Sequence, residues 1–212
     1  MAVLIPEIPQ DLPQHCVERK TLEELSKLSD EFFIFHRHTV NRSTSSTRRD
    51  GDTDMVIFNR KRGIVCADVI DGLLDYKEGK WYYDSGLPFE SGGPDKRAET
   101  LAEEVRQRIS NSSMSDILDR CGIYKLAWFL QVTDMIRMYM DLPEDFSCRL
   151  QLADALEDGL WSFAYRIFSP TRGEGDYVKT DLSEEEAYQL ITVVLCPMFD
   201  VTPDEFVYYQ EK

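Results

Sequence analysis

The stretch GDTDMVIFNRKRGIVCADVID, residues 51–71, constrains the fold of this chain more than any other. It holds two short apolar runs rich in β-branched residues, 55–58 and 63–69, with the polar residues NRKR between them. This pattern is typical of two buried strands joined as a hairpin. We therefore expect a central sheet, and the rest of the sequence is interpreted around it.

The other patterns predict helices and further strands around this hairpin. A capping box at Thr21 predicts a helix over residues 21–28, and Ser183 predicts the cap of a second helix over 184–195. Further helices are expected just beyond Pro94 and over 154–168. Strands are expected over 32–35 and 124–132, with a second hairpin, 73–75 and 81–83, around Glu78 and Gly79. This order indicates an α/β or α+β fold.

Length and composition predict one domain of ordinary size with an appended C-terminal part. The chain has 212 residues, 42% of them hydrophobic, which suffices for a substantial core. We divide it into a domain of residues 1–170 and an acidic helical extension of residues 171–212. Without a basic, apolar leader or an apolar run of membrane-spanning length, the expectation is a soluble cytoplasmic protein that does not contact a membrane. Five scattered cysteines suggest core residues, neither a disulfide framework nor a zinc site.

Charge is distributed unevenly along the chain. The net charge of -15 argues against avid, non-specific binding to phosphate backbones. Residues 37–62 nevertheless hold seven basic residues against three acids, whereas residues 171–212 hold ten acids against three basic residues. Uneven solubility charge would explain both segments. The alternative is that the basic window binds nucleic acid, for which the candidates are Arg48, Arg49, Arg60, Lys61 and Arg62.

Two aspartates on the first hairpin form a candidate metal site. Because strand side chains two residues apart share a face, Asp68 is a lone carboxylate on the apolar face that also carries Cys66 and Ile70. Asp54, at the start of the neighbouring strand, could approach it. Two such carboxylates can hold Mg²⁺, which would activate a water and neutralise phosphate charge. The alternative is that Asp54 is a turn residue and that Asp68 pairs with an arginine or a backbone amide.

The motifs in residues 17–168 resemble those of the nuclease-related domain, NERD, a branch of the restriction-endonuclease-like PD-(D/E)xK superfamily. CVERKTLEELSKLSDEFFIFHRHTV resembles the family's first helix, with Glu18 at the family's Glu, and GDTD resembles its Gly-Glu-x-Asp element. MVIFNRKRGIVCADVID resembles its Glu-x-Lys strand, with Asp68 at the Glu and Ile70 at the Lys. Three further elements follow in the family's order: GKWY, the helix after Pro94, and KLAWFLQVTDM. Arg97 stands where the family often has a Gln, and Leu130 stands where the family usually has a Pro.

The resemblance implies a mixed central sheet flanked by helices, with Mg²⁺, or Mn²⁺ as a substitute, bound by Asp54 and Asp68 and helped by Glu18. Ile70 departs from the family pattern. The family's Lys orients the attacking water and stabilises phosphate charge, which an isoleucine cannot do. Arg97 is the first candidate for a replacement cation, so the candidate catalytic set is Asp54, Asp68 and Arg97. The alternatives are that Arg97 is a plain solvated helix residue and that Glu18 is an ordinary residue of a helix start. The weaker candidates for that cation are Lys61, Arg62 and Lys80.

Three functions stay open at this point. The favoured one is a degenerate nuclease-related module of DNA metabolism or defence that binds nucleic acid or protein and cleaves weakly or not at all. Its candidate partners are DNA and a helicase or other DNA-processing protein. The alternative is an active Mg²⁺-dependent deoxyribonuclease that uses a cation from another element. A minor alternative is an inhibitor whose acidic surface mimics DNA.

Overall fold

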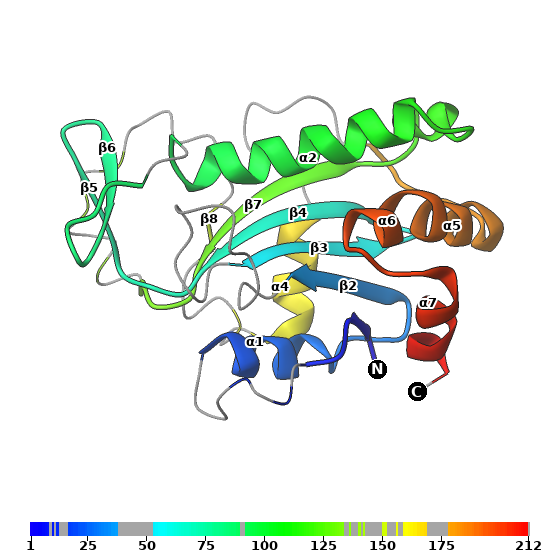
Figure 1. Ribbon diagram of the computed structural model, residues 1–212, viewed down its shortest axis with the longest axis horizontal. Coiled ribbons are helices and arrows are strands. Elements are labelled where there is room, and N and C mark those ends of the chain that lie inside the picture. Colours follow the sequence, from blue (N-terminus) through cyan, green and yellow to red (C-terminus); the bar gives the residue numbers. More distant parts are fainter. Residues whose placement is uncertain are drawn as a thin grey trace.

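A six-stranded mixed sheet forms the centre of the protein in the computed structural model, in the order β1-β2-β3-β4-β7-β8 (Figure 1). The structure describes residues 1–8, 10, 12, 17–37, 53–89, 92–133, 136, 140, 142, 150–151, 156, 159–168 and 178–211. The strands are β1 (Val3–Ile5), β2 (Phe32–Arg37), β3 (Thr53–Asn59), β4 (Gly63–Ile70), β7 (Ile123–Phe129) and β8 (Leu150–Gln151). Strand β3 is antiparallel to both its neighbours, and the other neighbouring pairs are parallel.

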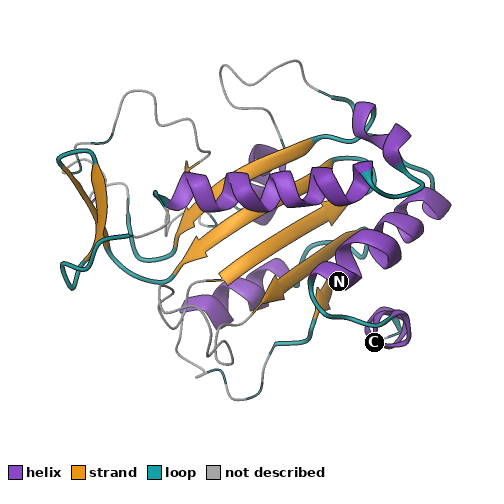
Figure 2. Cartoon of the chain, turned by 45° about the horizontal axis from the view of Figure 1, so that its top comes forward, coloured by secondary structure: helices purple, strands orange, loops and turns teal. Residues whose placement is uncertain are grey.

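Helices cover both faces of this sheet (Figure 2). One face packs against α1 (Val17–Leu25) and α4 (Leu160–Ile167). The other packs against α2 (Pro94–Ser110), the 3₁₀ turn η2 (Ser115–Asp119) and the C-terminal helical segments. These segments are α5 (Glu184–Leu190), the π-helical η3 (Ile191–Leu195), α6 (Cys196–Met198) and α7 (Pro203–Gln210). The predicted class, a mixed central sheet flanked by helices, is confirmed.

Strand β4 is buried over its whole length because both its faces are covered. Val65, Ala67 and Val69 point to the side of α1 and α4. Ile64 and Cys66 point to the side of α2 and the C-terminal helices. The two-residue alternation predicted for this run is therefore confirmed, and it places Asp68 on the α2 side.

The second predicted hairpin is present as β5 (Leu74–Lys77) and β6 (Lys80–Tyr83), which project at one end of the molecule (Figure 1). Its turn residues Glu78 and Gly79 have φ values of 52° and 78°. Two consecutive positive φ angles are characteristic of the type I′ turn, whose twist matches that of the strands. The hairpin is anchored by its aromatic side chains, since the rings of Trp81 and Phe129 lie 5.6 Å apart, edge to face.

Residues beyond 171 contribute to the same core as the strands. Leu182, Leu190, Leu195 and Phe206 are buried in one cluster with Phe58 of β3. The segment assigned above as a C-terminal extension thus packs on the sheet and closes one of its faces. Helix α7 also contacts β1, so segments from the two ends of the chain lie side by side (Figure 1).

Several predicted boundaries are wrong. Helix α1 begins at Val17, so Thr21 lies in the middle of the helix, where its side chain is buried, instead of capping it. Strand β7 ends at Phe129 instead of residue 132. Helix α4 begins at Leu160, while most of residues 154–158 lie outside the described part of the chain. Within the described residues, no helix is long and apolar enough to cross a membrane.

Candidate functional site

Asp68 lies near the carboxyl end of β4, with its side chain turned toward α2. The side chain is only 1% exposed, so its charge needs a partner. Arg97 supplies one, because its Nη2 donates a hydrogen bond of 2.8 Å to Asp68 Oδ1. The structure thus brings together two of the three predicted catalytic residues as a buried ion pair.

Arg97 is held from two sides. It lies in the first turn of α2, which starts at Pro94 after Gly92 and Gly93, whose φ values are 79° and 123°. The guanidinium carbon lies 4.8 Å from the centroid of the Phe89 ring, a cation–π geometry. With an exposed side-chain fraction of 12%, Arg97 faces the interior more than the solvent. Its planar fork is therefore fixed toward Asp68.

Asp54 lies directly opposite Asp68 in the antiparallel register of β3 and β4. On its other side it lies opposite Arg37 of β2. Side chains directly opposite in a sheet share a face and interact, and two like charges in that position repel. The row Arg37, Asp54, Asp68, together with Arg97 from α2, has two carboxylates between two guanidinium groups. Its formal charge sums to zero.

Arg37 is anchored by the C-terminal segment. Its Nη2 donates to the backbone carbonyl of Met198, and its guanidinium carbon lies 5.2 Å from the Phe199 ring centroid. From the sequence alone, Arg37 is one of the seven basic residues of the window 37–62. Arg37 follows the strand predicted over residues 32–35, which places it near the end of that strand. Its position opposite Asp54 depends on the register of two strands joined by a long polar segment, and the sequence does not give that register.

Ile70, at the position of the family's Lys, is fully buried. It belongs to an apolar cluster with Trp81, Phe89, Ala98 and Phe129, beneath the β5–β6 hairpin and α2. The position that would hold a catalytic ammonium is therefore occupied by packed apolar side chains.

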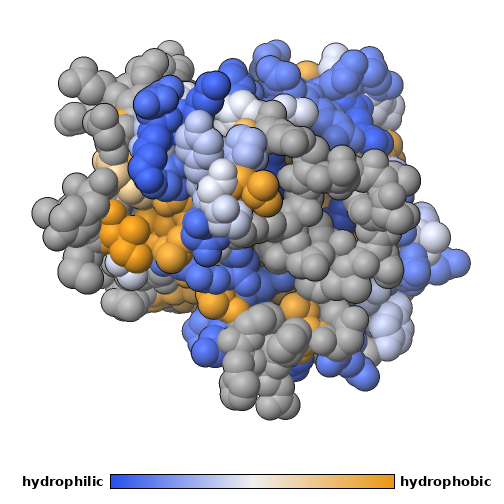
Figure 3. All heavy atoms as spheres, turned by 60° about the vertical axis from the view of Figure 1, so that its left-hand side comes forward, coloured by the Kyte–Doolittle hydropathy of each residue, from blue (hydrophilic) through white to orange (hydrophobic). Residues whose placement is uncertain are grey.

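Viewed from the hairpin end, the surface of the molecule shows a hydrophobic area beside hydrophilic ones (Figure 3).

Glu18 does not join the two aspartates. It is buried on α1, and α1 packs on the face of the sheet opposite to Asp68. Across the described residues, no three His, Cys, Asp or Glu side chains are grouped so that they could hold a metal ion. Of the predicted set of Glu18, Asp54 and Asp68, the structure thus brings only Asp54 and Asp68 together.

The described basic residues of the window 37–62 lie at opposite ends of strand β3, with Arg37 near Asp54 and the others at the β3–β4 turn. Arg60, Lys61 and Arg62 form the turn between β3 and β4, at the end of the hairpin remote from Asp54 and Asp68. Arg60 lies 3.7 Å from Glu184, and Lys61 lies 3.4 Å from Glu31. Arg48 and Arg49 lie outside the described residues. Lys80 lies next to the tip of the second hairpin, opposite Lys77.

Cys66 shares the Asp68 face of β4 but offers no reactive thiolate. Burial raises the pKa of the Cys66 thiol far above its usual range, against a smaller opposing effect of Arg106. Cys121 and Cys196 are also buried, with thiol pKa values raised to about 12 and about 11 by desolvation. These cysteines fit the expectation of core residues, whereas Cys16 and Cys148 lie outside the described chain.

Compared with protein-family models, curated proteins and solved structures, the chain matches none.

Proposed function

We propose that this chain is a nuclease-related domain of the NERD type that has lost efficient cleavage and acts by binding. The order of its elements supports this proposal. Helix α1, strands β3 and β4, the β5–β6 hairpin, helix α2 and strand β7 follow one another as the resemblance predicts. The equivalents of the family's two acidic strand positions, Asp54 and Asp68, are direct neighbours across the sheet.

The observation that carries the proposal is the Asp68–Arg97 pair above the buried Ile70. Arg97 already neutralises the carboxylate that a metal ion would need, at 2.8 Å. The position of the family's Lys is packed in an apolar cluster, so no ammonium is present to orient a water there. Loss of one such electrostatic donor costs roughly 10²–10³ in rate in other enzymes. Binding without efficient cleavage is the function that this arrangement supports best.

Among the two classes of partner, protein is better supported than nucleic acid by the described residues. Binding to phosphate backbones draws on clustered Lys and Arg. Here Arg60 and Lys61 lie beside acidic side chains, Arg37 donates to the backbone carbonyl of Met198, and Arg97 donates to Asp68. The net charge of -15 also opposes attraction to nucleic acid. A gel-shift titration with double- and single-stranded DNA tests this preference, and tight, salt-sensitive binding would reverse it.

A second candidate is a Mg²⁺-dependent deoxyribonuclease. It is favoured by the same row, because Asp54 and Asp68 lie opposite one another and a cation already contacts Asp68. In this candidate, the two carboxylates would hold the metal ion, which would activate water and neutralise phosphate charge. Arg97 would stabilise the charge that develops on the phosphate.

A cleavage assay separates the two candidates. Purified protein is incubated with plasmid and with single-stranded DNA in Mg²⁺ and in Mn²⁺, beside Asp54→Ala and Asp68→Ala. We expect the wild-type protein to give no cleavage above the level of the two variants. Cleavage that both substitutions abolish would overturn the proposal and establish the second candidate.

A double variant that moves the positive charge tests whether the absence of a Lys at position 70 is the reason that the site does not cleave DNA. In the double variant Ile70→Lys/Arg97→Gln, the cation beside Asp68 moves from α2 to the strand position two residues away, on the same face. The matched control, Ile70→Met/Arg97→Gln, has no cation there. We expect Mn²⁺-dependent cleavage at least about tenfold higher in the first variant. If both fold by circular dichroism and neither cleaves, the site lacks more than its Lys.

A further inference from the structure

Among the described residues, strand β1 is the last strand of the sheet, and its outer edge is only partly used, because the Ala2 N–H donates a 3.0 Å hydrogen bond to the carbonyl oxygen of Ser26. It pairs with β2 on one side, from Val3 opposite Phe33 to Ile5 opposite Phe35. On its other side, the described residues place no further strand. An edge strand presents backbone N–H and C=O groups that can pair with another chain.

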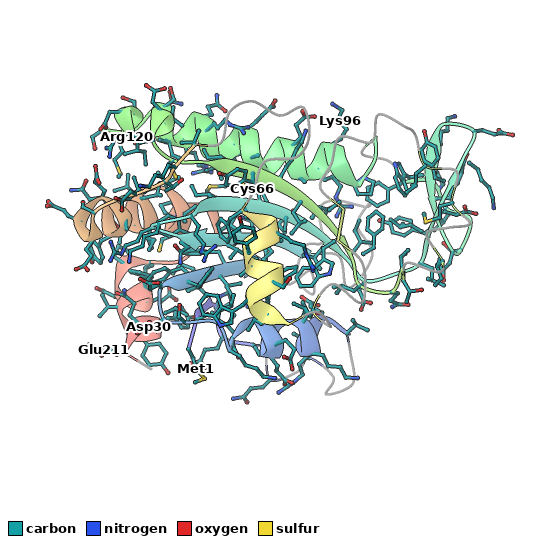
Figure 4. The ribbon with its side chains drawn as sticks, turned by 180° about the vertical axis from the view of Figure 1, so that it is seen from behind. Met1, Asp30, Cys66, Lys96, Arg120 and Glu211 are labelled. Carbon is teal, nitrogen blue, oxygen red and sulfur yellow. The ribbon has the colours of Figure 1, made fainter. Side chains whose placement is uncertain are left out.

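A groove of about 440 Å³ lies beside this strand. It is bounded by β1, by the segment that follows α1 and by the last turn of α7, with lining residues that include Leu4, Glu7, Ile8, Asp30, Tyr209 and Gln210. Seen from behind, Met1, Asp30 and Glu211 meet at one corner of the molecule (Figure 4). The groove thus combines a strand edge that is only partly used with a side wall, as a site for an extended peptide requires.

The charged side chains of the groove are acidic. Glu7 and Asp30 are both exposed, and none of the ten lining side chains is a Lys, Arg or His. The neighbouring segment continues this charge, because residues 180–211 contain eight acids and no basic side chain. Apolar surface accompanies the carboxylates, since Val3, Leu4 and Ile8 are partly exposed and Met1 is 84% exposed.

We propose that this groove binds an extended, basic segment of a partner protein by strand addition to β1. The main chain of the segment would hydrogen-bond to the backbone of Leu4 at the middle of β1, which gives affinity without regard to sequence. Lys or Arg side chains of the segment would lie near Glu7 and Asp30, and the alternate apolar side chains would lie on Leu4 and Ile8. Such alternation follows from the two-residue period of a strand.

This groove is separate from the Asp54–Asp68 row. Val3 lies in the cross-strand row of Phe33, Phe58 and Ile64, four residues before Asp68 along β4 and three strands away from it. At about 3.3 Å per residue and about 4.8 Å per strand, the separation is on the order of 20 Å. Binding in the groove therefore goes beyond the function proposed for the row, and its test gives the same answer whether or not the row cleaves DNA.

The probes are three fluorescein-labelled peptides used in fluorescence anisotropy with the full chain. KVKVKVK carries the proposed pattern, EVEVEVE reverses the charge, and a third peptide repeats KVKVKVK with N-methyl groups on alternate amides, which blocks strand pairing. We expect KVKVKVK to bind and each of the other two to bind about tenfold or more weakly. Equal binding of the N-methylated peptide would overturn strand addition, and equal binding of EVEVEVE would overturn the charge preference.

Two surface variants locate the site. Glu7→Gln/Asp30→Asn removes the groove's carboxylates, and Glu103→Gln/Asp119→Asn removes two exposed carboxylates of α2 and η2 with the same change in net charge. We expect the first to weaken KVKVKVK binding about three- to tenfold and the second to leave it unchanged. Hydrogen exchange should show new protection at residues 1–8 on binding. Equal weakening by both variants, or protection only elsewhere, would overturn the proposal.

Discussion

Arg97 offsets the cost of burying the charged carboxylate of Asp68. Asp68 is 1% exposed, and Asp54 lies opposite it on the neighbouring strand, so two negative charges adjoin in the interior. Burial of a carboxylate is costly unless it is paired or coordinates a metal ion. In this protein Arg97 pairs with Asp68, and Arg37 lies opposite Asp54 at the other end of the row.

Removal of Arg97 should lower the free energy of unfolding. We predict that Arg97→Met destabilises the protein by about 3–5 kcal/mol, because it leaves Asp68 as an unpaired buried charge. Urea unfolding at pH 7 measures the change. The matched control is Asp68→Asn/Arg97→Met, which removes the charge as well and should recover most of the loss. A cost below about 1 kcal/mol for Arg97→Met would mean that the pair does not hold the site together.

Much of the site could be predicted from local patterns, and the rest depends on long-range pairing. The two-residue alternation of β4 placed Asp68 and Ile70 on one face, which the structure confirms. Arg97 was singled out as a nearby cation, and it contacts Asp68. Arg37 escaped notice because its pairing with Asp54 depends on the register between strands separated by 15 residues. No local pattern encodes that register.

Arg120 joins two elements far apart in the sequence. It follows η2, and its Nη2 donates a 2.6 Å hydrogen bond to Glu186 Oε1 in the first turn of α5. The other oxygen of Glu186 accepts from the backbone N–H of Ser183, which completes a capping box at the predicted cap residue. The hydrogen bond from Arg120 and those from Ser183 lower the pKa of Glu186 to about 2.

This shift predicts an acid-dependent loss of stability. The pKa of Glu186 is lower in the folded protein than the ordinary 4.5, so its stabilising effect is complete above about pH 4.5 and disappears as the pH falls toward about 2. In Arg120→Gln, we expect the pKa of Glu186 to rise, as measured by carbon-13 NMR titration. Arg108→Gln, which removes an exposed pair with Glu104, should leave it unchanged. A wild-type value near 4.5 would contradict the prediction.

Gly63 allows β4 to start tightly against the residue that precedes β7. Its φ is 112°, and a Cβ there would lie 2.3 Å from the carbonyl oxygen of Gly122. We predict that Gly63→Ala costs more than Gly159→Ala, where φ is 95° but no atom of the described residues lies within 4 Å of the added Cβ. Backbone strain alone accounts for about 1–3 kcal/mol in each. Equal unfolding midpoints for the two variants would show that the contact with Gly122 relaxes freely.

The hairpins, which have clear apolar runs and polar turns in the sequence, could be predicted. The residues at which helices begin and strands end could be predicted less well. The β3–β4 and β5–β6 hairpins follow from apolar runs around polar turns. The start of α1 was misplaced because Thr21 has the sequence context of a cap, while its burial against the sheet places it inside the helix. Tertiary packing decided this boundary, and the capping pattern alone could not show it.

For the whole molecule, one core ties both ends of the chain to the sheet. Phe206 of α7 is fully buried, and its ring centroid lies 5.9 Å from that of Phe33 on β2. Arg37, in the carboxylate row, is likewise anchored by Met198 and Phe199. The C-terminal segment therefore supports the site as well as the fold, which its acidic composition did not reveal.

A shared core should unfold as a unit. We predict that Phe206→Ala costs about 3–5 kcal/mol because it removes a buried ring between two elements. Val207→Ala, at an exposed neighbouring position, should change the free energy of unfolding by less than about 0.5 kcal/mol. Tryptophan fluorescence and far-ultraviolet circular dichroism should give the same midpoint in each protein. Separate transitions would instead indicate that residues 178–211 unfold independently.

The most direct test of the account is a crystal structure of the protein soaked with Mn²⁺, with the metal located by its anomalous scattering. Under the proposed function, arginines have taken the place of a metal ion between Asp54 and Asp68. We therefore expect no Mn²⁺ between these carboxylates, with Arg97 still at hydrogen-bond distance from Asp68. A Mn²⁺ ion bound by both carboxylates, with Arg97 displaced from Asp68, would contradict it.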